Sequence, residues 1–131
     1  MKIEDVSIEE VNNNQLNSMN QKLSKITVID FILIEEVEVS YHTNELIALC
    51  PMTLIPDFYS LTIKYIPNNY IPELKSFKFY LLEYKDITIL HEHLAQKILR
   101  DFCSVVKPDR CEVCLKVNVR GGIQTEVVCQ K

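Results

Sequence analysis

The sequence predicts an α+β domain in which two consecutive helices cover one face of an antiparallel sheet. Runs rich in β-branched and aromatic residues lie on both sides of a central region in which apolar residues recur at helical spacing. The order of strands, two helices and strands favours helices gathered on one face of the sheet. A chain of 131 residues can bury the core of one domain, but hardly of two.

Residues 1–24 are polar and rich in asparagine, and we expect an extension that is loosely held or docks a partner. The single domain then covers residues 25–131. It opens with strand-forming residues over 25–42, whose end alternates glutamate or serine with valine or tyrosine, as in a half-buried strand. A second strand is expected over 59–67, ended by the turn residues of 67–70.

The helical region is expected to begin at Pro72, which suits the first turn of a helix. Apolar residues then recur on one helical face: Leu74, Phe77, Leu81 and Tyr84. A second helix is expected over about 88–106, ended by Pro108, with one apolar stripe: Leu90, Leu94, Ile98 and Phe102. Two closing strands are joined by the only glycines of the chain, Gly121 and Gly122, as in a hairpin.

Composition narrows the function classes. The formal charge of -4 argues against general binding to nucleic acids or membrane surfaces. The apolar stretches are too short and too interrupted to span a bilayer, and the acidic N-terminus shows no secretory signal. Five irregularly spaced cysteines favour a reducing cytoplasm over a disulfide framework.

Cys50 and Asp57 lie in an apolar segment, residues 49–58, that is punctuated by Pro51 and Pro56. A cysteine in apolar surroundings is more often an inert core residue than a nucleophile. The two prolines, however, indicate a rigid loop after a strand, and a charge in such an apolar loop indicates a function. A thiolate near a carboxyl group can act as a nucleophile with its proton donor, so both interpretations stay open.

Two sets of charged residues fit either a structural role or a ligand site. Lys75 and Lys78 share a helical face, which is a solvated surface or a site for a phosphorylated ligand. Glu92 lies between His91 and His93 at the start of the second helix. There it stabilises the helix start or accepts paired N–H donors from the edge of a guanine-like ring.

Arg120 stands beside the Gly-Gly turn, which is a plain hairpin or, with the arginine, a grip for phosphate. Cys111 and Cys114 are spaced like half of a metal site. In a strand they would face opposite sides, and no second cysteine or histidine pair follows at finger spacing, so no metal site is predicted. Cys103 and Cys129 are interpreted as packing residues.

Taken together, these segments resemble the NADPH-dependent 7-cyano-7-deazaguanine reductases (QueF), nitrile reductases of queuosine biosynthesis. That family shows a CPxTxxPDF loop, an E-(S/L)-K-S-x-K-x-Y motif, a His-Glu pair opening the second helix, and RGGI near the end. This chain has, in the same order, CPMTLIPDF at 50–58, ELKSFKFY at 73–80, His91-Glu92, and RGGI at 120–123. The resemblance spans about residues 46–123.

The resemblance implies a tunnelling fold, in which subunits of a homo-oligomer join their sheets into a barrel and form active sites between them. It implies that Cys50 attacks the nitrile carbon to give a covalent thioimide, and that Asp57 protonates the nitrile nitrogen. His91 would orient the substrate or relay protons. Two NADPH molecules would then give the aminomethyl product used in transfer RNA modification.

The resemblance also implies the binding residues. Glu92 would recognise the edge of the deazaguanine, with Glu73 as a possible second contact, and Leu90 stands where an aromatic residue of the family would lie against the base. The phosphates of NADPH would be held by Lys75, Ser76, Lys78 and Arg120. Neither nucleic acid nor membrane is expected as a direct partner.

The chain departs from the family pattern in two segments. Many members have TGQPD where this chain has residues 53–57, so that Leu54 replaces a glycine. The usual FRNHGDFHE reads YKDITILHE over 84–92.

Two alternative functions stay open, and the first of them follows from these departures. The altered 84–92 segment favours the related QueF-like amidinotransferases, in which ammonia attacks the same thioimide without NADPH. Retention of Lys75, Ser76 and Lys78 favours the reductase. A third hypothesis, from another class, is a non-catalytic tunnelling-fold subunit that binds a pterin or purine, and the presence of Cys50 with Asp57 argues against it.

Overall fold

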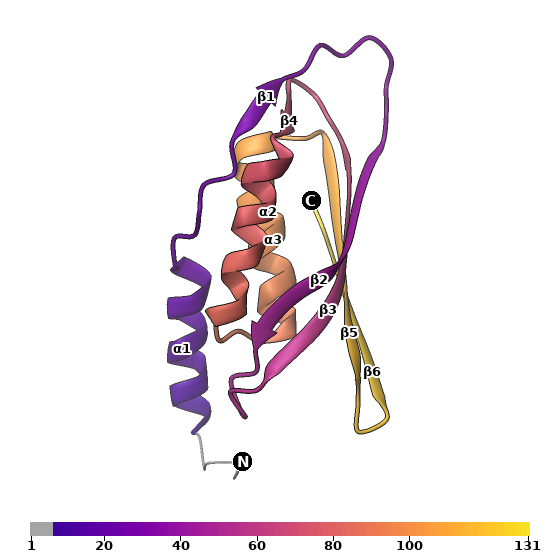
Figure 1. The fold of residues 1–131 in the computed structure, drawn as a ribbon. Coiled ribbons are helices and arrows are strands. Elements are labelled where there is room, and N and C mark those ends of the chain that lie inside the picture. The colour runs from indigo at the N-terminus through magenta and orange to yellow at the C-terminus, as the bar shows by residue number, and fades with distance from the viewer. Residues whose placement is uncertain (1–6) are drawn as a thin grey trace.

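A computed structural model describes residues 7–131, and of Ile8 and Arg120 it describes the backbone only. One four-stranded antiparallel sheet and two helices make up the main body. These elements are β2 (Val39–Leu49), β3 (Pro56–Ile66), β5 (Arg110–Arg120), β6 (Ile123–Gln130), α2 (Leu74–Leu82) and α3 (His91–Val106). The strand order is β2-β3-β5-β6, and both helices cover the same face of the sheet (Figure 1). The predicted α+β class is confirmed.

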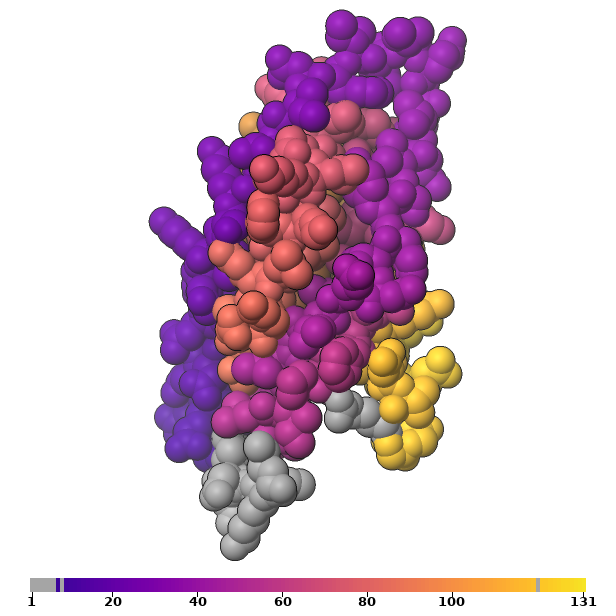
Figure 2. Space-filling model, in the orientation of Figure 1, coloured from indigo at the N-terminus to yellow at the C-terminus, as the bar shows by residue number. Residues whose placement is uncertain are grey.

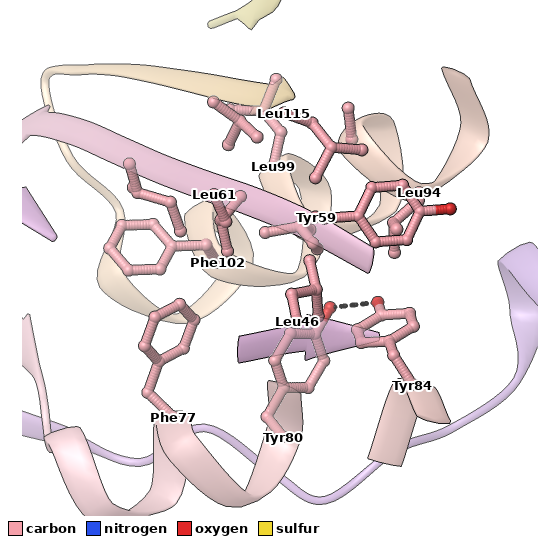
Figure 3. Close-up of a cluster of buried hydrophobic side chains, with 14 of the residues drawn as sticks. Leu46, Tyr59, Leu61, Phe77, Tyr80, Tyr84, Leu94, Leu99, Phe102 and Leu115 are labelled. Atoms are coloured by element: carbon pink, nitrogen blue, oxygen red, sulfur yellow. Dashed lines mark hydrogen bonds between the residues drawn. The ribbon is translucent and has the colours of Figure 1, made fainter. Parts of the chain in front are cut away.

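The core lies between the sheet and the two helices. Every second residue of β3 is buried from Asp57 onward, and β5 alternates in the same way, as expected for strands with one covered face. The helices contribute Phe77 and Phe102, whose rings meet edge to face (Figure 3). Phe102 also contacts Tyr65 of β3 edge to face. Tyr80 and Tyr84 share a buried hydrogen bond of 2.6 Å, drawn as a dashed line in Figure 3.

The predicted hairpin of β5 and β6 and the strand β3 are confirmed, with glycines of positive φ at the turn. The first predicted strand divides into β1 (Val28–Asp30), a connection over 31–38, and β2. Pro72 does not open a helix, because it ends β4 (Tyr70–Pro72) and pairs with Val28 of β1. The cap of α2 is therefore Glu73.

The polar N-terminal segment holds a helix that the sequence analysis does not predict, α1 (Ile8–Asn20). Ser7 and Glu10 form a reciprocal capping box at its start. The helix lies along the outer side of the helical layer (Figure 1) and buries Gln15 and Ser18 against it. Residues 1–6 of the predicted extension lie outside the described residues.

Among residues 7–131, no helix is both long and apolar enough to cross a membrane. After α2, a short 3-10 helix, η1 (Glu83–Asp86), leads to the extended residues 87–90. α3 consequently begins at His91 rather than near residue 88, because Ile87 and Ile89 bond to the end of β2 instead of joining the helix.

Candidate active site

Cys50 is the first residue of the closed loop that connects β2 to β3. Its N–H donates to the carbonyl of Ile55 at 3.0 Å, and the N–H of Leu54 donates to the carbonyl of Cys50 at 2.8 Å. The hydroxyl of Thr53 also accepts the N–H of Ile55 at 3.2 Å. These bonds close the loop around the half-exposed thiol, so the predicted loop after a strand is present.

Leu54 adopts a conformation that usually belongs to glycine. It has φ of 60° and is 60% exposed, at the point where the helical turn of the loop ends. An L-residue in this left-handed region brings its Cβ close to the following carbonyl, which costs about 1–2 kcal/mol. A glycine at this position, as in the family pattern that the sequence resembles, would suit this backbone, and the leucine stores strain in the Cys50 loop.

We expect Leu54→Gly to raise the free energy of unfolding by about 0.5–1 kcal/mol, because relief of strain exceeds the extra entropy of glycine in the unfolded chain. Met52→Gly is the matched control, since Met52 is exposed in the same loop and has no positive φ. It should lower the free energy of unfolding by a similar amount. Denaturant unfolding of both variants measures this, and equal losses would contradict the strain.

Asp57 is the second residue of β3 and lies on the face that the helices cover, with only 4% of its surface exposed. It is the register partner of Ala48, two residues before Cys50. Residues two apart on a strand point to the same side, so the thiol loop leaves the sheet next to the carboxyl group. The hairpin of β2 and β3 thus places Cys50 and Asp57 at the same end of the sheet.

Residues 87–90 bring the start of α3 to the same place. The N–H of Leu49 donates to the carbonyl of Ile87 at 2.9 Å, and the N–H of Ile89 donates to the carbonyl of Leu49 at 3.1 Å. Leu49 directly precedes Cys50. The predicted pair His91-Glu92 follows two residues after Ile89, so it opens α3 at the same end of the sheet as the Cys50 loop.

His91 contacts a residue that sequence reasoning did not select. The hydroxyl of Tyr59 lies 2.9 Å from Nδ1 of His91, and the two rings meet edge to face at 5.6 Å. Tyr59 is 1% exposed and stands two residues after Asp57 on the same face of β3. In the sequence it is one more apolar position of an alternating strand, and nothing there indicates its partner.

The neighbours of His91 differ in exposure. Glu92 is exposed in the first turn of α3, where its charge is favourable, and no described residue bonds to its carboxylate. Leu90 is half-buried and is the N-cap residue of α3. His93 turns away from His91, as predicted for positions two apart on a helix, and its Nδ1 lies 3.1 Å from Oε1 of Gln15.

Glu73 and Ser76 are engaged in the structure of their own helix. The carboxylate of Glu73 accepts the N–H groups of Lys75 and Ser76 at the start of α2, and these bonds lower the pKa of Glu73. The hydroxyl of Ser76 donates to the carbonyl of Glu73 at 2.7 Å and accepts the N–H of Thr27 at 2.9 Å. The Glu73 side chain thus caps α2, and the Ser76 side chain joins α2 to the segment before β1.

Lys75 and Lys78 are exposed on α2, as predicted for one solvated helical face. Lys78 also lines a groove of about 490 Å³ between α2 and the edge strand β2, on the side shown in Figure 2. The floor of the groove is apolar and includes Leu46, Leu61 and Phe77. An elongated ligand with an anionic end could therefore lie along α2.

One chain does not bring the two groups of predicted site residues together. α2 rises by roughly 13 Å and η1 by about 8 Å between Glu73 and Ile87. The start of α2 thus lies beside β4, at the end of the molecule opposite to the connection of β2 and β3 (Figure 1). Cys50, Asp57 and His91-Glu92 form one group, and the start of α2 forms another.

The side chain of Arg120 lies outside the described residues, and its backbone pairs with Ile123 at the hairpin turn. Cys111 is buried beneath the helices, whereas Cys114 faces the other side of the sheet and donates to Glu126 at 3.2 Å. Their predicted opposite orientation is confirmed. Cys103 is buried, and Cys129 is half-buried against the core.

Comparison with known proteins identifies the family and agrees with the fold. The sequence model of a family described as QueF-like protein matches residues 56–131. The NADPH-dependent 7-cyano-7-deazaguanine reductase of Caldicellulosiruptor bescii is 44% identical over 92 residues, which cover 70% of each chain. That of Elusimicrobium minutum is 37% identical over 111 residues, covering 85% of this chain and 84% of the relative. Among solved structures, the apo form of the archaeosine synthase QueF-Like matches with a TM-score of 0.64 at 26% identity, covering 73% of this chain and 92% of that one.

Proposed function

The chain belongs to the QueF-like family, and on this premise we propose that it reduces the nitrile of 7-cyano-7-deazaguanine to an aminomethyl group with NADPH, in queuosine biosynthesis. The observation that carries the proposal is the meeting of Cys50, Asp57 and His91-Glu92 at one end of the sheet. Relatives at 37% and 44% identity are named for this reaction. We place the protein in the cytoplasm, where reducing conditions keep its thiols free.

Cys50 and Asp57 carry the covalent step. A nitrile is a soft electrophile, and a thiolate adds to its carbon. The bond from Sγ of Cys50 to carbon forms while one π bond between carbon and nitrogen breaks. Asp57 takes the proton of the thiol and passes it to the nitrile nitrogen, so that a neutral thioimide results. The buried position of Asp57 supports this role, because water competes poorly for its proton there.

His91 and Glu92 orient the ring. Two acceptor oxygens of Glu92 suit the adjacent N–H donors of a guanine edge. When Tyr59 donates its hydroxyl proton to Nδ1, His91 is neutral and keeps its other proton on Nε2 as a donor. Glu73 remains a proposed second contact, although its carboxylate already caps α2.

The residues present fit NADPH. Lys75 and Lys78 are exposed and close together on α2, which suits the phosphates, and the groove beside Lys78 is lined by apolar side chains. Ser76 and Arg120 are the further proposed contacts. When bound, NADPH supplies two electrons as a hydride, and the four-electron reduction of a nitrile to an amine needs two such molecules. Cys50 would hold the substrate carbon through the first reduction. The bond from Sγ to that carbon then breaks, the thiolate leaves, and the resulting C=N bond is the one that the second reduction saturates.

We also infer a homo-oligomer with active sites between subunits. The sheet ends in two edge strands, β2 and β6, that a second copy could pair with. A neighbouring copy could supply the lysines that lie far from Cys50 within one chain. Direct contact with nucleic acid or membranes is not part of this proposal.

Addition of ammonia to the thioimide is the second candidate function. It is favoured by the similarity to an archaeosine synthase structure and by the altered segment of residues 84–92.

An NADPH assay separates the two functions. If the protein is a reductase, NADPH absorbance should fall when the nitrile is added, with two NADPH consumed for each aminomethyl product. An amidine formed from ammonia, with NADPH untouched, would replace the reductase by the transferase.

Tyr59→Phe tests the role given to His91. It keeps the ring and removes one hydrogen bond to Nδ1, which should lower kcat/KM for the nitrile about three- to tenfold. Tyr65→Phe is the matched control, because Tyr65 is equally buried on the same strand and its hydroxyl bonds to Tyr41 at 2.8 Å. The two variants should lose similar stability, and steady-state rates should change only in the first. Equal rates in both variants would contradict the role of Tyr59.

A further inference from the structure

The first turn of α3 lacks a cap from its own sequence. Its N-cap residue is Leu90, whose side chain has no hydrogen-bonding atom, and His91, Glu92 and His93 follow as the first three helical residues. In a capping box, the side chain of the third helical residue accepts the N–H of the N-cap residue. His93 occupies that position but does not make this bond.

Gln15 of α1 supplies the missing acceptor from another helix. Its Oε1 accepts the N–H of Leu90 at 2.8 Å and lies 3.1 Å from Nδ1 of His93. A backbone N–H can only donate, so the amide oxygen must face it, and Nδ1 of His93 must carry its proton. Gln15 is 2% exposed, and its amide nitrogen has no partner among the described residues. Both hydrogen bonds of the buried Gln15 side chain are therefore made by its oxygen.

A second residue of α1 holds the same segment. The hydroxyl of Ser18 donates to the carbonyl of Thr88 at 2.6 Å, so α1 bonds on both sides of Ile89. The end of α1 contacts α3 further along, where Lys97 donates to the carbonyl of Gln21 and Arg100 to that of Met19. The contacts at the start and in the middle of α3 can thus be removed separately.

We propose that Gln15 is a positioning residue for substrate recognition, because it completes the N-terminal cap of α3 and thereby holds Glu92 in place. The role in recognition rests on the proposed function, whereas the capping role does not. Without the bond from Gln15, the first turn of α3 opens more often and Glu92 loses its orientation. The lysines on α2 are unaffected, so binding of substrate and of NADPH should respond differently.

Steady-state kinetics of the full chain separate these effects. Gln15→Ala should raise KM for 7-cyano-7-deazaguanine about tenfold, the loss of one buried hydrogen bond, and leave KM for NADPH within about twofold. Gln15→Glu keeps an acceptor oxygen and should restore most of the affinity. Arg100→Ala is the matched control, since it weakens the docking of α1 without touching the first turn of α3. A parallel rise of both KM values in Gln15→Ala, or no change in either, overturns the positioning role.

Amide hydrogen exchange tests the cap independently of activity. The N–H of Leu90 should exchange about tenfold faster in Gln15→Ala than in the wild-type chain, and at the wild-type rate in Arg100→Ala. If Gln15→Ala does not fold, Ser18→Ala is used, and it should accelerate exchange across residues 87–90. Unchanged exchange at Leu90 overturns the cap. An inactive wild-type chain would instead overturn the proposed function and leave this measurement interpretable.

Discussion

Cys50→Ala is expected to abolish both the covalent adduct with 7-cyano-7-deazaguanine and the oxidation of NADPH that the nitrile triggers. The loss in kcat/KM should be at least about a thousandfold, because the proposed route requires the bond from Sγ of Cys50 to the nitrile carbon. Intact-protein mass spectrometry detects the adduct, and NADPH absorbance measures the rate. The fold should survive, since the thiol is half-exposed and the loop is closed by backbone bonds.

Cys129→Ala is the matched control for that experiment. Cys129 is also half-buried, but it lies on β6 against the core. Its replacement should leave adduct formation and NADPH oxidation within about twofold of the wild-type values, because β6 is the edge strand opposite to β2 and lies away from the Cys50 loop. If the adduct persists in Cys50→Ala and disappears in Cys129→Ala, the nucleophile is Cys129 and its assignment to Cys50 is wrong.

Asp57→Asn is expected to lower kcat by about a hundred- to a thousandfold, the usual contribution of a general acid or base. The amide has nearly the shape of the carboxyl group but cannot carry a proton between Cys50 and the nitrile nitrogen. The adduct should still form, only more slowly, since the thiol remains. Rates of adduct formation from mass spectrometry and of NADPH oxidation should therefore fall together.

Asp109→Asn controls for the loss of one negative charge. Asp109 is exposed just before β5, where it accepts a hydrogen bond from Asn68 at 3.1 Å. Its replacement should leave the rate unchanged. A kcat for Asp57→Asn within threefold of the wild-type value would remove Asp57 from the chemistry and leave it as a structural carboxyl group.

The sequence predicted those elements whose own residues show a clear pattern. β3 alternates buried and exposed residues, α3 shows a clear apolar stripe, and the hairpin turn contains the only two glycines. Tertiary hydrogen bonds decided the remaining boundaries. Residues 87–90 fit a helix by spacing, yet they extend along Leu49 because two backbone bonds to β2 replace the helical ones.

The helix α1 was missed because its composition argues against it. Asn12, Asn13 and Asn14 are poor helix formers, and the segment is polar on most sides. One signal was present: Ser7 is followed by Glu10, the spacing of a capping box. The helix is held by hydrogen bonds to α3, and a sequence pattern does not show which residues of another element will bond to it.

The candidate site could be predicted only in part. The motifs selected Cys50, Asp57 and the His-Glu pair, and the hairpin of β2 and β3 brings the first two together. They could not indicate that Glu73 caps its own helix, or that Tyr59 contacts His91. These contacts depend on how the elements pack against one another, and the spacing of residues along the sequence does not predict them.

A mass-spectrometric chase tests the central claim, that the thioimide on Cys50 is an intermediate of reduction. The protein is incubated with 7-cyano-7-deazaguanine alone, and the adduct is located on the peptide that contains Cys50. NADPH or ammonia is then added to separate samples. We predict that the adduct disappears with NADPH, with release of the aminomethyl product, and persists with ammonia. An adduct that persists with NADPH but yields an amidine with ammonia, or the absence of any adduct at Cys50, would contradict the account.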